Sequence, residues 1–256
     1  MNLREALETA VRTMTEGREV AVAFSGGLDS GTVAVLASRY AGSVRLYTVG
    51  TEDSYDVRAS REMAEGLGLE WEHIPLDDAL LTDTIRESVR ITGTEDPITL
   101  SFEVPLAVIL SHVKEGFVIG GQGADEMLCG YSKYLNLSEK ELREAVGRDI
   151  GVLESVTLPH EKAIADHFGK KVLYPFLSGC VRETVAEPSY EDIRPVGDDR
   201  KRPLRDVAEQ LGHPEIASKP KKAAQYGSGS MNMMKHLSKA KGMSLSEWIG
   251  SLSEGS

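Results

Sequence analysis

Cysteine is scarce in this sequence: its 256 residues include only Cys129 and Cys180. The two lie far apart and form no C-x-x-C pair, which argues against a structural zinc site and against an iron–sulfur cluster. A chain of this length buries a sizeable core without disulfide bonds. We therefore expect a protein of a reducing, cytoplasmic environment.

Long apolar runs and an excess of positive charge are also missing. No apolar run approaches the ~20 residues of a membrane-spanning helix, and the N-terminus has a polar helix pattern rather than that of a signal peptide. Lys and Arg number 29 against 40 Asp and Glu, a formal net charge of −11. Strong nucleic-acid binding needs clustered Lys and Arg, and the one basic cluster is local, at residues 200–202 and 219–222. We therefore expect neither a membrane nor nucleic acid as a partner.

Short apolar runs alternate with helix-like segments through the first half of the chain. This alternation implies βαβ units and a parallel sheet. We predict an α/β fold in which a twisted parallel sheet of about five strands carries helices on both faces. The expected strands are residues 19–24, 44–49, 69–74 and 117–120, and the expected helices are residues 3–14, 32–40, 55–67, 77–91 and 100–113.

The pattern changes from about Ser138, where helices follow one another without obvious strands. The expected helices are residues 138–153, 159–168, 177–186 and 204–211, with a loop rich in proline and charge at 187–203. We place a soft boundary near Tyr134, between an α/β core (1–134) and a mostly helical part (135–256). The two parts are expected to form one compact unit.

The segment SGGLDS follows the first expected strand and precedes a helix. The start of a helix offers unpaired N–H groups and partial positive charge, and the glycines permit close approach of an anion. Asp29 suits Mg²⁺, which binds through one or two carboxylates together with phosphate oxygens. The Walker-A and G-x-G-x-x-G patterns are absent. The candidate pyrophosphate-binding residues are Ser25, Gly26, Gly27, Leu28, Asp29 and Ser30.

A second loop, GGQGADE at residues 120–126, follows the fourth expected strand. Ligands of open parallel sheets sit at the carboxyl ends of the strands, so both loops are expected to face one crevice. Gly120, Gly121 and Gly123 permit close backbone approach, and Asp125 offers a second carboxylate for Mg²⁺. Either loop alone is also typical of an ordinary turn, but the pair favours a polyphosphate site.

These motifs carry a resemblance to a known family. SGGLDS resembles the pyrophosphate loop of the N-type ATP pyrophosphatases, and GQGADE followed by G-Y-x-x-Y resembles the synthetase domain of the asparagine synthetases. The resemblance extends over nearly the whole chain through the segments TVGTEDSYDVRASREMAEGLG (48–68), YPFL (174–177), KRPLR (201–205) and SKPKKAAQYGSG (218–229).

The resemblance implies a Rossmann-like fold of the adenine-nucleotide α-hydrolase type and cleavage of ATP to AMP and pyrophosphate. Asp29 and Asp125 would hold Mg²⁺, and the backbone near Val49 and Gly120–Gly121 would hold adenosine. Lys221 would stabilise the charge that develops at the reaction centre. Lys219 and Lys222 remain competitors for this role, and a basic loop is otherwise typical of a solvated surface.

Two departures from the family leave the substrates open. Met1 leads directly into the synthetase part, so nitrogen is expected from free ammonia, from a separate glutaminase subunit or from the substrate's own amine. The family's E-x-R-x-P-F-L-D segment has Lys171, Leu173 and Ser178 in place of its Glu, Arg and Asp. Because of these replacements, the resemblance does not establish aspartate as the acceptor acid.

The leading hypothesis is an ATP-dependent ligase that adenylates a small carboxylate substrate and forms an amide with an amine donor. One alternative is adenylation of a tRNA base before thiolation, which predicts a basic RNA-binding surface and catalytic cysteines. Another is a non-catalytic nucleotide sensor, or a partner subunit of a separate glutaminase. A homodimer is compatible with each of these.

Overall fold

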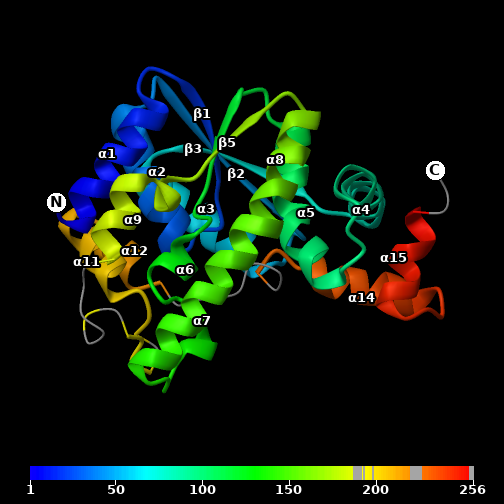
Figure 1. Cartoon of the computed structure of the whole chain (residues 1–256). Coiled ribbons are helices and arrows are strands. Elements are labelled where there is room, and N and C mark those ends of the chain that lie inside the picture. The colour runs from blue at the N-terminus through cyan, green and yellow to red at the C-terminus, as the bar shows by residue number, and fades with distance from the viewer. Residues whose placement is uncertain (187–191, 193, 198, 220–226, 254–256) are drawn as a thin grey trace.

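The computed structural model describes residues 1–186, 192, 194–197, 199–219 and 227–253. Five parallel strands form one sheet in the order β3-β2-β1-β4-β5 (Figure 1). The strands are β1 (Glu19–Ala23), β2 (Ser43–Gly50), β3 (Glu70–Pro75), β4 (Phe117–Ile119) and β5 (Lys171–Leu173). The predicted five-stranded parallel α/β fold is thereby confirmed.

Helices cover both faces of the sheet because successive strand residues point to opposite sides. Val20 and Val22 of β1 pack into one core cluster, whereas Ala21 packs into the other. The first face carries α1 (Leu3–Thr15), α2 (Leu28–Tyr40), α3 (Tyr55–Leu67), α9 (Gly179–Ala186), α11 (Arg202–Gln210) and α12 (Pro214–Ala217). The second carries α4 (Asp78–Thr92), α5 (Pro97–His112), α8 (Leu158–His167), α14 (Ser230–Ala240) and α15 (Leu245–Ser253).

A third group of elements lies between β4 and α8 in the chain. It comprises α6 (Ala124–Met127), the 3₁₀ turn η1 (Ser132–Tyr134), α7 (Glu139–Val152) and the π-helical turn η2 (Leu153–Thr157). A small cluster of buried side chains from this group, including Tyr134 and Leu142, supports it. Helices α7 and α8 follow one another through η2 without a loop, and the 3₁₀ turn η3 (Pro175–Leu177) comes after β5.

Strand β5 lies in the part of the chain from Ser138 onwards, where no obvious strand was expected, and completes the predicted sheet of about five strands. It pairs in parallel with β4, with Val118 opposite Val172. Strand β4 is equally short but forms the apolar run F-V-I, whereas β5 (K-V-L) begins with a lysine and has only two apolar residues. The boundary near Tyr134 stays a prediction, but the two parts on either side of it share one sheet.

Several helix ends also differ from the expected positions. Helix α2 begins at Leu28 rather than at residue 32, so half of SGGLDS forms its first turn. Helix α5 begins at Pro97 because the Asp96 side chain accepts a hydrogen bond from the N–H of Thr99. Helices α14 and α15 were not expected. No helix among the described residues is long and apolar enough to cross a bilayer.

Candidate active site

The SGGLDS segment links the end of β1 to the start of α2. Gly27 caps α2 without a side-chain hydrogen bond, so the first N–H groups of the helix are left for another acceptor. The backbone N–H of Ser25 donates to the hydroxyl of Ser30 (3.2 Å), and the two hydroxyls lie 3.1 Å apart. These bonds close the loop into a turn whose amides and hydroxyls suit an anion.

Gly26 fixes where this loop lies. Its φ is +67°, and a Cβ at this position would lie 2.5 Å from the backbone carbon of Ala59 and from the backbone nitrogen of Ser60. Only glycine fits this close approach to helix α3. The loop is therefore held between β1 and α3 by backbone contact.

The second loop lies directly against the first. A Cβ on Gly121 would meet the Cβ of Asp29 at 2.7 Å, and one on Gly123 would meet the side chain of Leu177 at 2.3 Å. Gly123 also has a φ of +88° and caps the short helix α6, which carries Asp125. Gly120 follows β4 at the carboxyl edge of the sheet. The structure thus brings together the loop residues that the sequence predicted would converge.

The carboxylates of Asp29 and Asp125 meet at a common cation, the ammonium of Lys201. The Nζ of Lys201 lies 2.6 Å from Oδ2 of Asp29 and 2.8 Å from Oδ1 of Asp125. The Lys201 side chain is 2% exposed. This contact was not predicted, because Asp29 and Asp125 lie far from Lys201 in the sequence; Lys201 stood out only in the basic cluster at 200–202 and in KRPLR.

Electrostatics keep Lys201 charged. Burial alone would lower the pKa of its ammonium, but the charges of Asp29 and Asp125 outweigh the burial and raise the pKa above its ordinary value. The second oxygen of Asp29, Oδ1, is buried and finds no hydrogen-bond partner within the described part of the chain. That oxygen is a ligand position that the protein itself leaves unused.

Two carboxylates from adjoining loops fit a Mg²⁺ ion that is also held by phosphate oxygens. The described residues contain no group of three or more acidic, His or Cys side chains arranged for a metal. A metal at Asp29 and Asp125 would therefore need ligands from a bound polyphosphate or from water. This donor set suits Mg²⁺ better than a metal that requires a full cage of protein ligands.

The predicted lysine loop is described at both ends but not at its centre. The Arg205 guanidinium donates to the carbonyls of Ala217 and Lys219, the second at 3.1 Å. At the other end, the carbonyl of Ser228 accepts from the N–H of Thr51, which follows β2 (3.2 Å). The loop therefore returns to the carboxyl edge of the sheet. Lys221 and its competitor Lys222 lie outside the described residues.

Val49 lies at the end of β2, at the same edge of the sheet. Its side chain is 4% exposed and packs into the second core cluster, so only its backbone is available to a ligand. Gly50 follows it, and a Cβ there would lie 2.6 Å from the Ser54 hydroxyl and 3.0 Å from the Ser228 carbonyl. The predicted contact of Val49 with adenosine stays a prediction.

A buried acidic cluster adjoins the second loop. The Gln122 side chain donates to Oε1 of Glu161 (2.8 Å), and His160 lies 2.8 Å from Oε1 of Glu103. Burial raises the pKa of Glu161 to about 7, despite the opposing effect of Tyr174. This cluster lies where β4 and β5 end, and it was not predicted from the sequence.

The replaced residues of the P-F-L-D segment lie next to this cluster in the chain. Leu173 packs against the first core cluster, and Lys171 is exposed at the start of β5. The Ser178 hydroxyl donates to the carbonyl of Pro175 (2.8 Å). None of the three supplies a charged group that is buried here, so the family's charged pattern has no counterpart at these positions.

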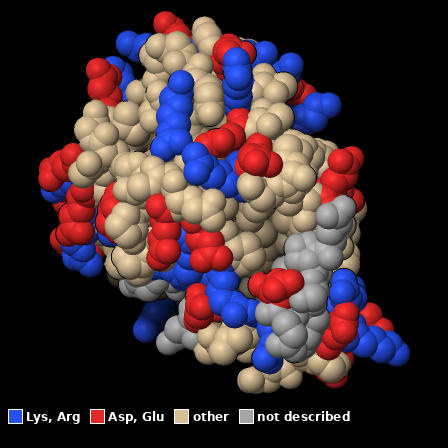
Figure 2. All heavy atoms as spheres, turned by 90° about the vertical axis from the view of Figure 1, so that its left-hand side faces the viewer, with Lys and Arg blue, Asp and Glu red and all other residues tan. Residues whose placement is uncertain are grey.

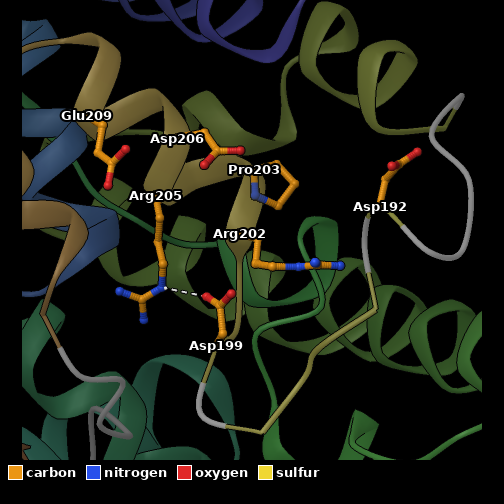
Figure 3. Close-up of a pocket in the computed structure, with 7 residues that line it drawn as sticks. All are labelled: Asp192, Asp199, Arg202, Pro203, Arg205, Asp206 and Glu209. Atoms are coloured by element: carbon orange, nitrogen blue, oxygen red, sulfur yellow. Dashed lines mark ion pairs between the residues drawn. The ribbon is translucent and has the colours of Figure 1, made fainter.

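A separate cavity of about 510 Å³ lies beside the start of α11 (Figure 3). No residue of SGGLDS or GQGADE lines it, so it is distinct from the two-loop site. Figure 2 shows acidic and basic side chains interspersed on the face of the molecule that carries α1, α9 and α11. The cavity is lined by Asp192, Asp199, Arg202, Pro203, Arg205, Asp206 and Glu209.

Comparison with known proteins identifies relatives over most of the chain. A protein of Methanocaldococcus jannaschii named as a glutamine-hydrolysing asparagine synthetase is 29% identical over 94% of this chain and 52% of its own length. Asparagine synthetase 1 of Arabidopsis thaliana is 29% identical over 75% of this chain and 36% of its own length. The chain thus spans about half or less of these relatives.

Among solved structures, NMN synthetase from Francisella tularensis has a TM-score of 0.48 and 14% sequence identity, with 99% of this chain and 94% of that chain covered. A likeness at this level carries no argument about function. The match to a family model is stronger, since the asparagine synthase model covers residues 2–149, more than half of the sequence. The chain therefore belongs to the asparagine synthase family.

Proposed function

We propose that this protein is an ATP-dependent ligase that adenylates a carboxylic acid, releases pyrophosphate and forms an amide with ammonia or another amine. One observation carries the proposal: two glycine-rich loops bring the carboxylates of Asp29 and Asp125 to one buried cation beside the open N-terminus of α2. Membership of the asparagine synthase family supports it.

In the first step, a carboxylate oxygen of the acid attacks the α-phosphorus of ATP. The bond from that phosphorus to the oxygen bridging to the β-phosphate breaks, and pyrophosphate leaves. The free N–H groups of α2 and the hydroxyls of Ser25 and Ser30 bind the departing pyrophosphate. Mg²⁺ at Asp29 and Asp125 would offset negative charge on the phosphates.

In the second step, the amine nitrogen attacks the acyl carbon of the adenylate. The bond from that carbon to the AMP oxygen breaks, AMP leaves, and the nitrogen loses one proton. We assign Lys221 to the negative charge on the tetrahedral oxygen and the α-phosphate, since a fixed ammonium stabilises such charge. Support comes from the described ends of its loop, which are fixed at Lys219 and Ser228.

Two observations favour this ligase over thiolation of a tRNA base. Burial raises the pKa of the Cys129 thiol to about 11, so this side chain is protonated and a poor nucleophile at neutral pH. Cys180 packs against the first core cluster and lies 3.4 Å from the carbonyl of Ala6. Neither thiol is placed for catalysis on a bound base.

Exchange of labelled pyrophosphate into ATP tests the first step by itself, because it needs the acid but no amine. The purified protein with ATP, Mg²⁺ and a panel of acids that begins with L-aspartate is expected to show exchange with one of them. Addition of ammonium or another amine should then release AMP and the amide.

The matched variants are Asp125→Asn and Lys221→Ala. The first is expected to abolish exchange, whereas the second should reduce amide formation at least tenfold with nucleotide binding retained. Formation of ADP and phosphate would contradict the proposal. Tight ATP binding without exchange on any acid would instead favour the nucleotide sensor or a subunit that needs a separate glutaminase.

A further inference from the structure

Lys201 differs from the other basic residues in its burial. Among the described residues it is the only lysine or arginine that is buried. It also has a φ of +58°, a backbone conformation that residues other than glycine rarely adopt. Such a conformation costs free energy and persists where the surrounding structure holds it in place.

Close contacts with neighbouring residues fix the position of the Lys201 ammonium. A Cβ on Gly130 would lie 2.0 Å from Cε of Lys201 and 2.0 Å from Oδ1 of Asp125, so only glycine leaves room for the contact. The turn that carries Lys201 is held by Arg205, whose Nε donates to the carbonyl of Arg200 (3.0 Å). The position of the cation is therefore set before any ligand binds.

We propose that the Lys201 ammonium is an exchangeable counter-ion that occupies the divalent-metal site until a metal–nucleotide complex displaces it. The carboxylate oxygens that hold Lys201 belong to the two residues assigned to the metal. Two cations at the same pair of oxygens would repel each other strongly in a buried setting. The inference rests on the proposed function in that it takes Asp29 and Asp125 as the metal ligands.

This exchange makes metal and nucleotide bind together. A free divalent ion must displace an ammonium that then has no partner in a buried site, which is costly. When a polyphosphate enters with the metal, its negative charge gives the ammonium a new partner. Free metal is therefore expected to bind weakly, and bound nucleotide raises its affinity, as linkage requires.

Binding of Mn²⁺ alone, followed by the EPR signal of the free ion, tests the proposal without turnover. Lys201→Met keeps the length of the side chain but removes its charge. This variant is expected to bind Mn²⁺ at least ten times more tightly than the wild type in the absence of nucleotide. Lys133→Met is the matched control, because Lys133 is exposed and pairs with Asp149 instead (2.7 Å); its Mn²⁺ affinity should equal that of the wild type.

The double variant K201M/D125N tests whether the additional Mn²⁺ affinity of Lys201→Met depends on Asp125. This double variant should lose the gain in Mn²⁺ affinity. Equal affinities of Lys201→Met and wild type, or a gain that survives Asp125→Asn, would overturn the proposal. These outcomes are separable from the proposed function, since pyrophosphate exchange in the wild type is measured independently.

If Lys201→Met does not fold, the wild type provides the test by NMR of ¹⁵N-labelled lysine. The buried ammonium should give a slowly exchanging Nζ signal that Asp125→Asn removes. Saturation with Mg²⁺ and a non-hydrolysable ATP analogue is expected to shift or abolish that signal. A signal unchanged by the saturated complex would show that Lys201 stays in place and that the proposal is wrong.

Discussion

At the residue scale, Glu161 is a buried carboxyl group beside the second loop whose protonation state is altered by its surroundings. Burial raises its pKa from 4.5 to about 7, so the folded protein retains a proton that the unfolded chain has lost between these pH values. The free energy of unfolding should therefore fall as pH rises from about 4.5 to about 7, by up to about 3 kcal/mol from this one group.

Glu161→Gln removes this loss while its amide oxygen still accepts from Gln122. Urea unfolding at pH 5 and pH 8 measures this effect. The free energy of unfolding of the variant minus that of the wild type should be larger at pH 8 than at pH 5. Glu144→Gln on the exposed face of α7 is the control and should leave the pH dependence unchanged. The same pH dependence in Glu161→Gln and wild type would refute the assignment.

The sequence predicted the residues of the two loops but not the cation between them. Ser25–Ser30 and Gly120–Asp125 are recognisable because each follows an apolar strand and holds its residues in one short motif. Lys201 and Glu161 are single residues whose partners, Asp29 and Gln122, come from other elements. The motif KRPLR contains Lys201 but does not indicate its partners, so only the folded chain reveals these contacts.

At the scale of elements, the packing of the SGGLDS loop against α3 depends on Gly26. A methyl group there would meet backbone atoms of Ala59 and Ser60, which cannot move aside as a side chain can. Gly26→Ala should lower the free energy of unfolding by about 2 kcal/mol or more, since a positive φ and overpacking add. Urea denaturation measures this change.

Gly66→Ala is the matched control for this prediction. Gly66 lies within α3, and nothing lies within 4 Å of the Cβ it would gain. Because alanine favours a helix over glycine, this variant should be about 0.5–1 kcal/mol more stable than wild type. If both variants were equally stable, the close contact between loop and helix would not exist in solution.

The strands of the first half of the chain, including the three-residue β4, followed from their apolar runs, whereas β5, α14 and α15 in the second half were missed. The expected strands at 19–24 and 44–49 correspond to β1 and β2, which are buried apolar runs. Strand β5 has three residues, and its place at the sheet edge is decided by pairing with β4. Helix α2 began early because Gly27 ends the loop within the motif itself.

At the scale of the whole molecule, we ask whether residues 1–134 and residues 135–256 unfold separately or together. Strand β5 lies in the second part but pairs with β4 of the first. Phe176 and Leu204 of the second part are buried in a core cluster together with Val20 and Leu36 of the first. Because the two parts share a sheet and both cores, we expect one cooperative unfolding transition.

The two tryptophans allow this expectation to be measured. Trp71 lies in β3 of the first part, and Trp248 lies fully buried in α15 of the second. Trp248→Phe leaves fluorescence from the first part alone, and Trp71→Phe leaves it from the second. In each variant, the urea midpoint from fluorescence should coincide with the midpoint from far-ultraviolet circular dichroism, which reports on the whole chain. A fluorescence transition that departs from the dichroism transition of the same variant would mean that the shared sheet does not couple the two parts, and that the boundary near Tyr134 separates independent domains.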